Sequence, residues 1–314
     1  MLDSDDDTLE FFSAVERGRR FFAGRAIPVH VKFGAASHAG KVRPVNQDHF
    51  AVVERRRSRQ VLLTNLDPKF LHLPNDEAYV MIVADGMGGA ASGELASSLA
   101  IRTAWDLTNR ITKWVMRMNE DEPPEVRERV DTLVHMINRV LRDRAAENPQ
   151  LAGMGTTLTA VYTMGPDAVI SHVGDSRAYH YRKGHLKQLT HDHTLAQEML
   201  DAGADESETI GYRHILTNCL GGGSDHVTAD ITFTTLEDQD GLLLCSDGLT
   251  LHVSDDEIRK VLNEHDVPQA ACDALVRLAL DRGGKDNVTV VLARYTILEA
   301  ACSQSDEDTA PLSS

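Results

Sequence analysis

The chain has 314 residues, 42% of them hydrophobic and 25% charged, and a formal net charge of −16 at pH 7. This composition predicts a globular protein of one or two domains with a sizeable buried core. The acidic balance argues against a nucleic-acid partner, and the lack of any run of about 18 apolar residues in the sequence argues against a membrane-spanning helix.

The N-terminal part predicts an accessory segment followed by strands. Residues 1–26 are interpreted as that segment, containing one helix, and a single domain is expected over 27–298. "PVHVKFGAASHAG" and "DHFAVVE" predict its first two strands. Residues 55–78 are interpreted as a long hairpin connection or insertion, and its basic run "RRRSR" (55–59) as a solvated turn.

The central part predicts a buried strand and two long helices. The continuous apolar run "AYVMIVAD" is typical of a strand that is covered on both faces. Helical patterns follow over about 92–118 and 124–147, and Pro123 and Pro124 are expected to separate them.

Three further strand patterns follow these helices. They are "TTLTAVYTM", "DAVISHVGD" and "RAYHYRKGHLKQLT", the last of which predicts a hairpin that turns at Lys183 and Gly184. Residues 192–225 predict a short helix that ends near Gly203, followed by a polar, glycine-rich loop.

The C-terminal part predicts two strands, two helices and a last strand. "HVTADITFTTL" and "GLLLCSD" are the strands, and "NVTVVLARYTI" is the last one. One helix begins at Ser254, where Glu257 completes a capping box, and the other begins near Pro268. The acidic tail 299–314 is expected to be disordered.

The glycine turn after the buried strand resembles a dinucleotide-binding turn in spacing only. Gly86, Gly88 and Ala91 match the pattern G-x-G-x-x-A. Such a unit needs a parallel strand within about 30 residues and an acid at its end, whereas here Asp106 lies inside a predicted helix. Asp85 would also repel a pyrophosphate. The P-loop pattern fails as well, because its Lys-Ser/Thr pair is missing.

Cysteine usage predicts a cytoplasmic protein. The four cysteines (Cys219, Cys245, Cys272 and Cys302) are widely spaced and form no C-x-x-C pair, as expected for reduced thiols. The N-terminus is acidic and lacks the basic start and apolar stretch of a signal peptide.

Five aspartates stand where a predicted strand ends in a turn: Asp48, Asp85, Asp175, Asp247 and Asp286. Taken singly, each is explained by turn formation. Together they would converge if the strands lie side by side, and converging carboxylates repel unless a cation offsets their charge. An all-oxygen ligand set favours Mg²⁺ or Mn²⁺ over zinc. A two-metal site of this kind activates water for in-line attack on a phosphoryl group.

Arg43 is the candidate phosphate ligand of such a site. It lies five residues before Asp48, and a guanidinium binds phosphate in a bidentate manner. The alternative is that Arg43 forms an ordinary surface salt bridge.

Eight motifs occur in the order found in one enzyme family. They are "RPVNQD", "ADGMGG" with "GELAS", "GTTL", "GDSRAY", "LTHDHT", "LTNCLGG", "CSDGL" and "KDNVTVV". Over about residues 30–297 the chain therefore resembles the metal-dependent protein phosphatases (PPM, the type 2C Ser/Thr phosphatases), with a bacterial character. The resemblance implies an α+β fold, a four-layer α-β-β-α sandwich of two antiparallel sheets flanked by helix pairs.

The resemblance also implies a role for each candidate residue. Asp85 would bridge two Mn²⁺ or Mg²⁺ ions, with the Gly86 carbonyl and Asp48 on one of them. Asp247 and Asp286 would hold the other ion, and Asp175 with Asp247 a third, weaker one. Arg43 would bind the phosphate, and residues 192–225 would form the flap beside the active site.

Several positions depart from the family pattern. Gln47 and Met87 are choices usual in bacterial members, whereas Ala90 replaces a histidine that has been considered a proton donor. The general acid is therefore unassigned, and water bound to a metal is an alternative donor. Three histidines in loops near the motifs are interpreted as ordinary surface or turn residues: His38, His191 and His193. Asn218 replaces a frequent flap arginine, which predicts different substrate contacts.

Thr156, Thr157, Ser176 and Arg177 belong to the motifs but are interpreted as packing and turn residues. The partners implied are phosphorylated proteins and a cognate Ser/Thr kinase pathway, with no nucleic acid and no membrane; the oligomeric state is open. Two alternatives remain: a non-catalytic scaffold with the same fold, and a phosphatase whose residues 1–26 and 55–78 gate the site or dock a partner.

Overall fold

The computed structural model describes residues 29–58, 60–67, 75–115, 123–223 and 226–297. Their strands form two antiparallel sheets. The five-stranded sheet has the order β1 (Val29–His38), β12 (Val288–Ile297), β11 (Gly241–Cys245), β7 (Arg177–Arg182), β8 (His185–Gln188). The seven-stranded sheet has the order β10 (Asp230–Thr235), β6 (Asp167–Val173), β5 (Leu158–Met164), β3 (Asn75–Met87), β4 (Gly155–Thr156), β9 (Leu220–Gly221), with β2 (Asp48–Ser58) paired to β3.

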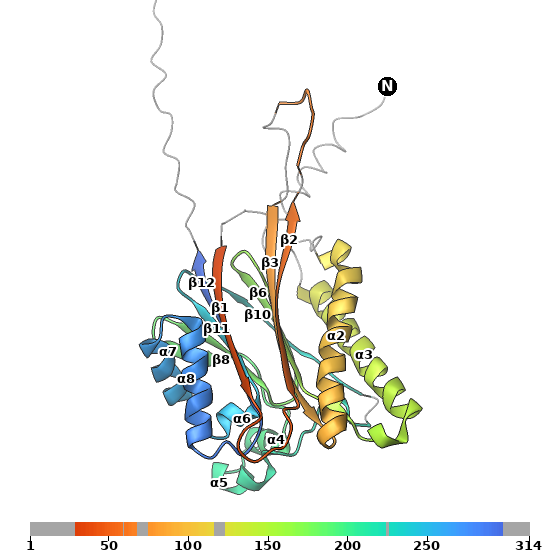
Figure 1. The fold of residues 1–314 in the computed structure, drawn as a ribbon, viewed down its shortest axis with the longest axis vertical. Helices are drawn as coiled ribbons and strands as arrows, with labels where there is room; N and C mark the ends of the chain where they lie inside the picture. The colour runs from red at the N-terminus through yellow and green to blue at the C-terminus, as the bar shows by residue number, and fades with distance from the viewer. Residues whose placement is uncertain (1–28, 59, 68–74, 116–122, 224–225, 298–314) are drawn as a thin grey trace, which may run out of the picture.

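The two sheets lie between two pairs of helices (Figure 1). The seven-stranded sheet is covered by α2 (Ala90–Val115) and α3 (Pro123–Glu147), and the five-stranded sheet by α7 (Asp255–Glu264) and α8 (Pro268–Asp281). The predicted α-β-β-α sandwich is confirmed. Because β3 pairs antiparallel with both β2 and β5, the strand, glycine turn and helix are not part of a dinucleotide-binding unit.

The continuous apolar strands are explained by burial on both faces. In β11, Leu242 and Leu244 join the core between the sheets, whereas Leu243 and Cys245 join the core under α7 and α8. Successive side chains of a strand point to opposite faces, so a strand in the middle of four layers needs apolar residues at every position.

The helix signals are mostly confirmed. The capping box of Ser254 and Glu257 is present at the start of α7, and Pro268 is the first residue of α8. The second long helix, predicted over about 124–147, is confirmed as α3 and begins one residue earlier, at Pro123. Proline is well suited to the first turn of a helix, where its missing N–H costs no hydrogen bond.

The connection predicted over 55–78 does join two strands as a hairpin, but it is strand at both ends, where residues 55–58 pair with residues 75–78. β2 continues to Ser58 and pairs there with Asn75, so the hairpin projects well beyond the rest of the sheet (Figure 1). The described part of the basic run is therefore strand and not a turn. Arg56 is exposed, yet it lies opposite Glu77 in register and its Nε is 3.4 Å from the Glu77 carboxylate. Opposite charges across a strand pair favour this extension.

The flap has more structure than predicted. The short helix near Gly203 is confirmed as α4 (Leu195–Asp201). The segment predicted as loop also contains α5 (Glu206–Thr209), the 3₁₀ turn η3 (Ile210–Tyr212) and β9.

The remaining local predictions are confirmed or lie outside the described residues. The hairpin turns at Lys183 and Gly184, with φ of 49° and 81°. β10 is shorter than the pattern at 226–236. Cys219, Cys245 and Cys272 are free thiols. Residues 1–26, Cys302 and the tail 299–314 are not among those described.

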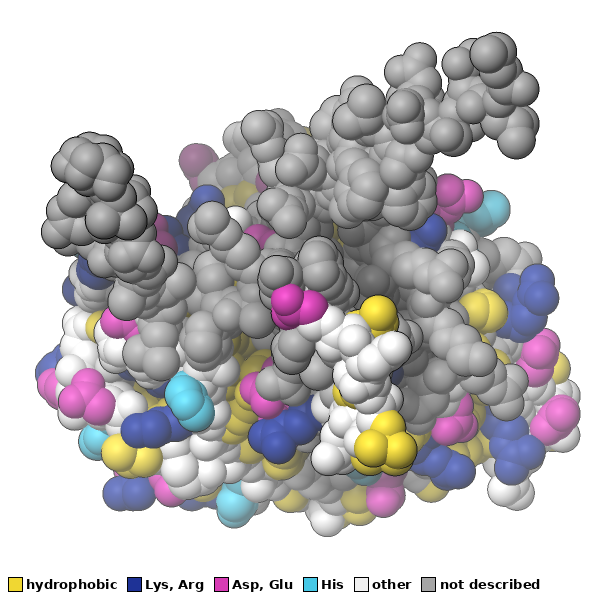
Figure 2. All heavy atoms as spheres, turned by 90° about the horizontal axis from the view of Figure 1, so that it is seen from above, with side chains coloured by type: hydrophobic (Ala, Val, Ile, Leu, Met, Phe, Trp, Pro, Cys, Tyr) yellow, Lys and Arg dark blue, Asp and Glu magenta, His cyan; other side chains and the backbone are white. Residues whose placement is uncertain are grey.

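None of the helices in the described ranges is long and apolar enough to cross a membrane. Viewed from the end where the hairpin projects, the described surface carries Lys and Arg interspersed with Asp and Glu (Figure 2). Such a mixture is ordinary for a protein surface.

Candidate active site

Asp48 and Asp85 lie opposite each other in the β2–β3 hairpin. Asp48 begins β2, and its partner in register is Asp85, near the end of β3. Residues that are directly opposed on antiparallel strands have Cβ atoms about 5 Å apart. Met81 and Val83, which share a face of β3 with Asp85, belong to the core between the sheets. Both carboxylates therefore point into the space between the two sheets.

Three more aspartates reach the same space from other strand ends. Asp175 follows β6, Asp247 follows β11 and begins the short helix α6 (Asp247–Thr250), and Asp286 precedes β12. Together with Asp85, they line one cavity of about 600 Å³, whose wall also includes Arg43 and Gly86. Asp48 is outside the lining and is buried, with 5% of its surface exposed. The structure therefore brings the predicted site residues together, with Asp48 behind Asp85.

These carboxyl groups are held where ionisation is unfavourable. Burial raises the pKa of Asp48 from 3.8 to about 6, and burial with the neighbouring Asp192 raises the pKa of Asp175 to about 7. The pKa values of Asp85 and Asp247 are well above the ordinary range, first because of burial and then because of the other carboxylates. Each ionised carboxylate makes ionisation of its neighbours less favourable, so a cation bound among them would relieve the repulsion.

Two buried carboxylate oxygens have no partner. The Ser246 hydroxyl donates to Oδ2 of Asp48 over 2.6 Å, but Oδ1 of Asp48 and Oδ1 of Asp247 accept no hydrogen bond from any residue that the structure describes. Buried oxygens normally have a partner, so each of these calls for an explanation. In the described residues, no group of three or more His, Cys, Asp or Glu side chains is placed to hold a metal ion as it stands.

Arg43 is at the mouth of this cavity and forms a salt bridge with Asp286. Its Nε donates to Oδ1 over 2.9 Å and its Nη2 donates to Oδ2 over 2.6 Å. The side chain of Arg43 is 51% exposed. The predicted phosphate ligand is thus close to the acids, and the salt bridge considered as an alternative is also present.

Threonine hydroxyls hold the backbone of Asp85. The Thr156 hydroxyl donates to the Asp85 carbonyl over 2.8 Å, and the Asp85 N–H donates to the Thr157 hydroxyl over 2.9 Å. The Thr157 hydroxyl in turn contacts that of Ser176 at 2.8 Å. These residues do pack, as predicted, and they also fix the position of Asp85. Arg177 has a separate, structural partner in Asp192, at 2.6 Å.

Asn287 is a positioning residue that the sequence interpretation missed. Its Nδ2 donates to the carbonyls of Ala39 and Val45, and its Oδ1 accepts from the N–H of Gln47. Asn287 therefore ties the β1–β2 loop, which carries Arg43, to the residue next to Asp286. The signal was available in "KDNVTVV", where the amide directly follows a candidate ligand.

Gly86 is required by a close approach of backbone to backbone. A Cβ built on Gly86 would lie 2.0 Å from the carbonyl oxygen of Gly93, in the first turn of α2. The missing side chain thus lets helix α2 start directly against the strand end that carries Asp85.

The loop histidines near the motifs are engaged away from the acids. Nδ1 of His38 accepts from the N–H of Gly40, and Nε2 of His191 is 2.7 Å from Asp201. His193 is 3.1 Å from Asp230 and also accepts from the N–H of Gly174. None of these three is in the lining of the Asp85 cavity. Their interpretation as ordinary surface or turn residues agrees with these contacts.

Asn218, which replaces a frequent flap arginine, is likewise turned toward the flap. Its Nδ2 donates to the Thr228 carbonyl over 2.7 Å and lies 3.1 Å from Nδ1 of His193. Asn218 therefore connects its part of the flap to His193 and to Thr228, and it is absent from the cavity lining.

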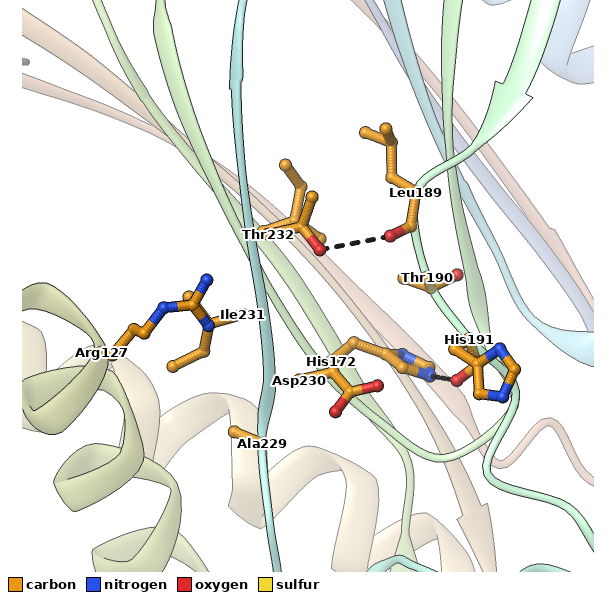
Figure 3. A pocket seen from close by; sticks show the side chains of 10 residues that line it. Arg127, His172, Leu189, Thr190, His191, Ala229, Asp230, Ile231 and Thr232 are labelled. Atoms are coloured by element: carbon orange, nitrogen blue, oxygen red, sulfur yellow. Dashed lines mark hydrogen bonds between the residues drawn. The ribbon is translucent and has the colours of Figure 1, made fainter. Parts of the chain in front are cut away.

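A second cavity, of about 270 Å³, lies beside the edge strand β10 (Figure 3). Arg127, His191 and Asp230 contribute to its wall. Both ring nitrogens of the buried His172 are hydrogen-bonded. Nδ1 is 2.9 Å from the Thr159 hydroxyl, and Nε2 is 3.0 Å from the His191 carbonyl. In the wall of the cavity, Asp230 is 3.1 Å from His193, the Thr232 hydroxyl donates to the Leu189 carbonyl, and Arg127 lies over the Phe233 ring, so these groups already have contacts within the protein.

The sequence of this chain matches a protein family whose assignment agrees with the fold and with the converging acids. The sequence profile of the family "Protein phosphatase 2C" matches residues 63–287, a range that includes Asp85, Asp175, Asp247 and Asp286. The chain belongs to the protein phosphatase 2C family.

Named relatives are serine/threonine phosphatases of bacteria. The serine/threonine protein phosphatase PstP of Mycobacterium tuberculosis is 37% identical over 220 residues, which are 69% of this chain and 40% of PstP. The serine/threonine phosphatase stp of Listeria innocua is 30% identical over 274 residues, 86% of this chain and 98% of stp. The chain thus matches 40% of the length of the first relative and nearly all of the second.

A crystal structure of the PstP catalytic domain with two manganese ions has the same fold. It aligns with a TM-score of 0.64 at 32% identity and covers 85% of this chain and 99% of that one. A relative of this chain therefore binds two manganese ions.

The residues of this chain fit such ions chemically. The candidate donors are all oxygen atoms, the type that Mn²⁺ and Mg²⁺ prefer. The unpartnered Oδ1 atoms of Asp48 and Asp247 are buried, and a cation would satisfy both. It would also offset the burial of the Asp85 carboxylate and the repulsion from its neighbours, which together raise the pKa of Asp85.

Proposed function

We propose that this protein is a protein serine/threonine phosphatase that depends on Mn²⁺ or Mg²⁺ and hydrolyses phosphoserine and phosphothreonine in proteins. The observation that carries the proposal is the pair of buried, unpartnered carboxylate oxygens on Asp48 and Asp247, beside a cavity that Arg43 also lines. The family and the activity named for its relatives support the same function.

The proposed ligands divide between two core ions. Asp85 is shared by both, Asp48 and the Gly86 carbonyl complete one site, and Asp247 and Asp286 hold the other. Asp175 with Asp247 would hold a third, weaker ion. When bound, such ions supply a water nucleophile at neutral pH and offset the charge of the phosphoryl group.

The remaining residues position the substrate and the ligands. Arg43 presents its guanidinium at the cavity mouth, where it can bind two phosphoryl oxygens at once. Thr156 and Thr157 fix the backbone of Asp85, so that its carboxylate needs little reorganisation. The substrates would be products of a Ser/Thr kinase pathway, because such kinases form the phosphoserine and phosphothreonine esters that this reaction hydrolyses.

The test is phosphate release from a phosphothreonine peptide. The protein is treated with EDTA, freed of the chelator, and assayed with and without added Mn²⁺. We expect release only with Mn²⁺ and none above background from the Asp247→Ala variant. Release by the metal-free protein, or by that variant at the wild-type rate, would overturn the proposal.

A further inference from the structure

The proposed reaction needs a proton donor. A serine or threonine side chain leaves the phosphoryl group as an alkoxide, which departs readily only if it is protonated as the P–O bond breaks. The turn after Asp85, "GMGGA", contains no titratable side chain. A side chain that donates this proton therefore has to come from another segment that reaches the same cavity.

Histidine is the side chain best suited to this role near neutral pH. His38, His191 and His193 are directed to Gly40, Asp201 and Asp230. Figure 3 shows His191 in the second cavity, with its carbonyl bonded to His172. Of the histidines that the structure describes, only His214 lines the cavity of Asp85.

The backbone around His214 is held in place while its ring stays open to the cavity. The N–H of Leu195 donates to the Ile215 carbonyl over 2.8 Å, and the N–H of Thr217 donates to the His193 carbonyl over 3.0 Å. Leu216 forms an isolated bridge with Thr194. The His214 side chain is exposed and makes no hydrogen bond to another described residue. It is thus placed by the flap and free to contact a substrate.

We propose that His214 is the general acid for the leaving group, an assignment that rests on the proposed function. The oxygen of the attacking water forms the new bond to phosphorus as the bond to the serine or threonine oxygen breaks. The imidazolium of His214 gives its proton to that departing oxygen. The proton that the attacking water loses to solvent restores the imidazolium, so one water is consumed for each alcohol and phosphate released.

The surroundings of His214 fit this role. The charged or titratable groups that share its cavity are Arg43, Asp85, Asp175, Cys219, Asp247 and Asp286. Arg43 lies on the β1–β2 loop and His214 on the flap. A phosphoryl group held by Arg43 would therefore share the cavity with the imidazole of His214.

The experiment compares two substrates whose leaving groups differ in their need for a proton. A phosphothreonine peptide releases an alkoxide, whereas p-nitrophenyl phosphate releases a phenolate that is stable without protonation. For His214→Gln and His214→Ala, we expect kcat on the peptide to fall by about 10²-fold or more, the range for loss of a general acid. On p-nitrophenyl phosphate, kcat should stay close to the wild-type value, which also shows that each variant is folded.

His191→Gln is the matched control, because His191 is an exposed histidine just before the flap and lies outside this cavity. It should leave both substrates unaffected. Imidazole added to the buffer should restore part of the peptide activity of His214→Ala. Equal losses on both substrates, or an unchanged peptide rate, would overturn the assignment of His214 and leave the proposed function standing. Absence of Mn²⁺-dependent release by the wild type would overturn the proposed function and this assignment with it.

Discussion

Asp48 and Asp85 are opposed in register across β2 and β3, and Asp48 accepts a hydrogen bond of 2.6 Å from Ser246, which follows β11 of the other sheet. A single carboxylate thus joins the two sheets at the point where both present strand ends. The arrangement places charges together that would repel each other without a cation. The fold is therefore built to concentrate negative charge at one position.

The stability of the metal-free protein should depend on pH in the direction opposite to that of a salt-bridged acid. The pKa of Asp48 is raised from 3.8 to about 6, so the folded state holds a proton that the unfolded state has already lost. Stability from this group is present below pH 3.8 and is lost as the pH rises toward 6. Asp175, with a pKa of about 7, extends the loss to neutral pH.

Urea unfolding in EDTA at a series of pH values measures this effect. We expect the free energy of unfolding to fall between about pH 4 and 7, by about 1.4 kcal/mol for each unit of pKa shift. The Asp48→Asn variant should show a smaller fall, and saturating Mn²⁺ should reduce it in the wild type. A pH dependence that is the same in the variant and the wild type would contradict the electrostatic account.

Arg43→Lys should weaken substrate binding in the transition state. Lysine keeps the charge but loses the two parallel donors that Arg43 now directs at Asp286. We expect kcat/KM for a phosphothreonine peptide to fall by about 10- to 100-fold, the effect of losing one charged hydrogen bond. Arg259→Lys, an exposed arginine of α7 paired with Asp256, is the control and should change nothing. Identical kinetics in the two variants would argue against a phosphate-binding role.

Gly86→Ala should destabilise the protein and disturb the site at the same time. The new Cβ would lie 2.0 Å from the Gly93 carbonyl oxygen, so α2 or the end of β3 has to move. We expect a loss of about 2–3 kcal/mol in unfolding free energy, as for other overpacked sites. Gly211→Ala is the matched control, since its Cβ meets nothing within 4 Å and its φ is unstrained. Equal stability of the two variants would refute this role of Gly86.

The sequence predicted those features that local patterns determine. Apolar runs that end in aspartate located β3, with Asp85 near its end, and β11, with Asp247 just after it. A strand that is covered on both faces can place a carboxylate only near its end, because its other positions are apolar. The capping box at Ser254 and the turn at Lys183 are likewise encoded by adjacent residues. The order of the motifs then sufficed to predict the sandwich.

Features that depend on distant contacts were not predicted. The extension of β2 rests on Arg56 facing Glu77 across the hairpin, and no local pattern reveals that register. The position of His214 depends on the flap folding back onto α4 through the bond between Leu195 and Ile215. Asn287 acts through three backbone groups of another loop. The boundaries of the accessory segment and the metal-ligand role of each aspartate stay predictions.

The central claim is that the buried aspartates exist to hold divalent cations that drive phosphate release. The most direct measurement titrates the EDTA-treated protein with Mn²⁺ while following both metal binding and phosphate release from a phosphothreonine peptide. It is made on the wild type and on Asp85→Asn, whose amide keeps the shape but not the charge of the shared carboxylate. We expect the wild type to bind two ions tightly and to gain activity as they bind, and Asp85→Asn to fold but lose both. An Asp85→Asn variant that releases phosphate at the wild-type rate would contradict the account.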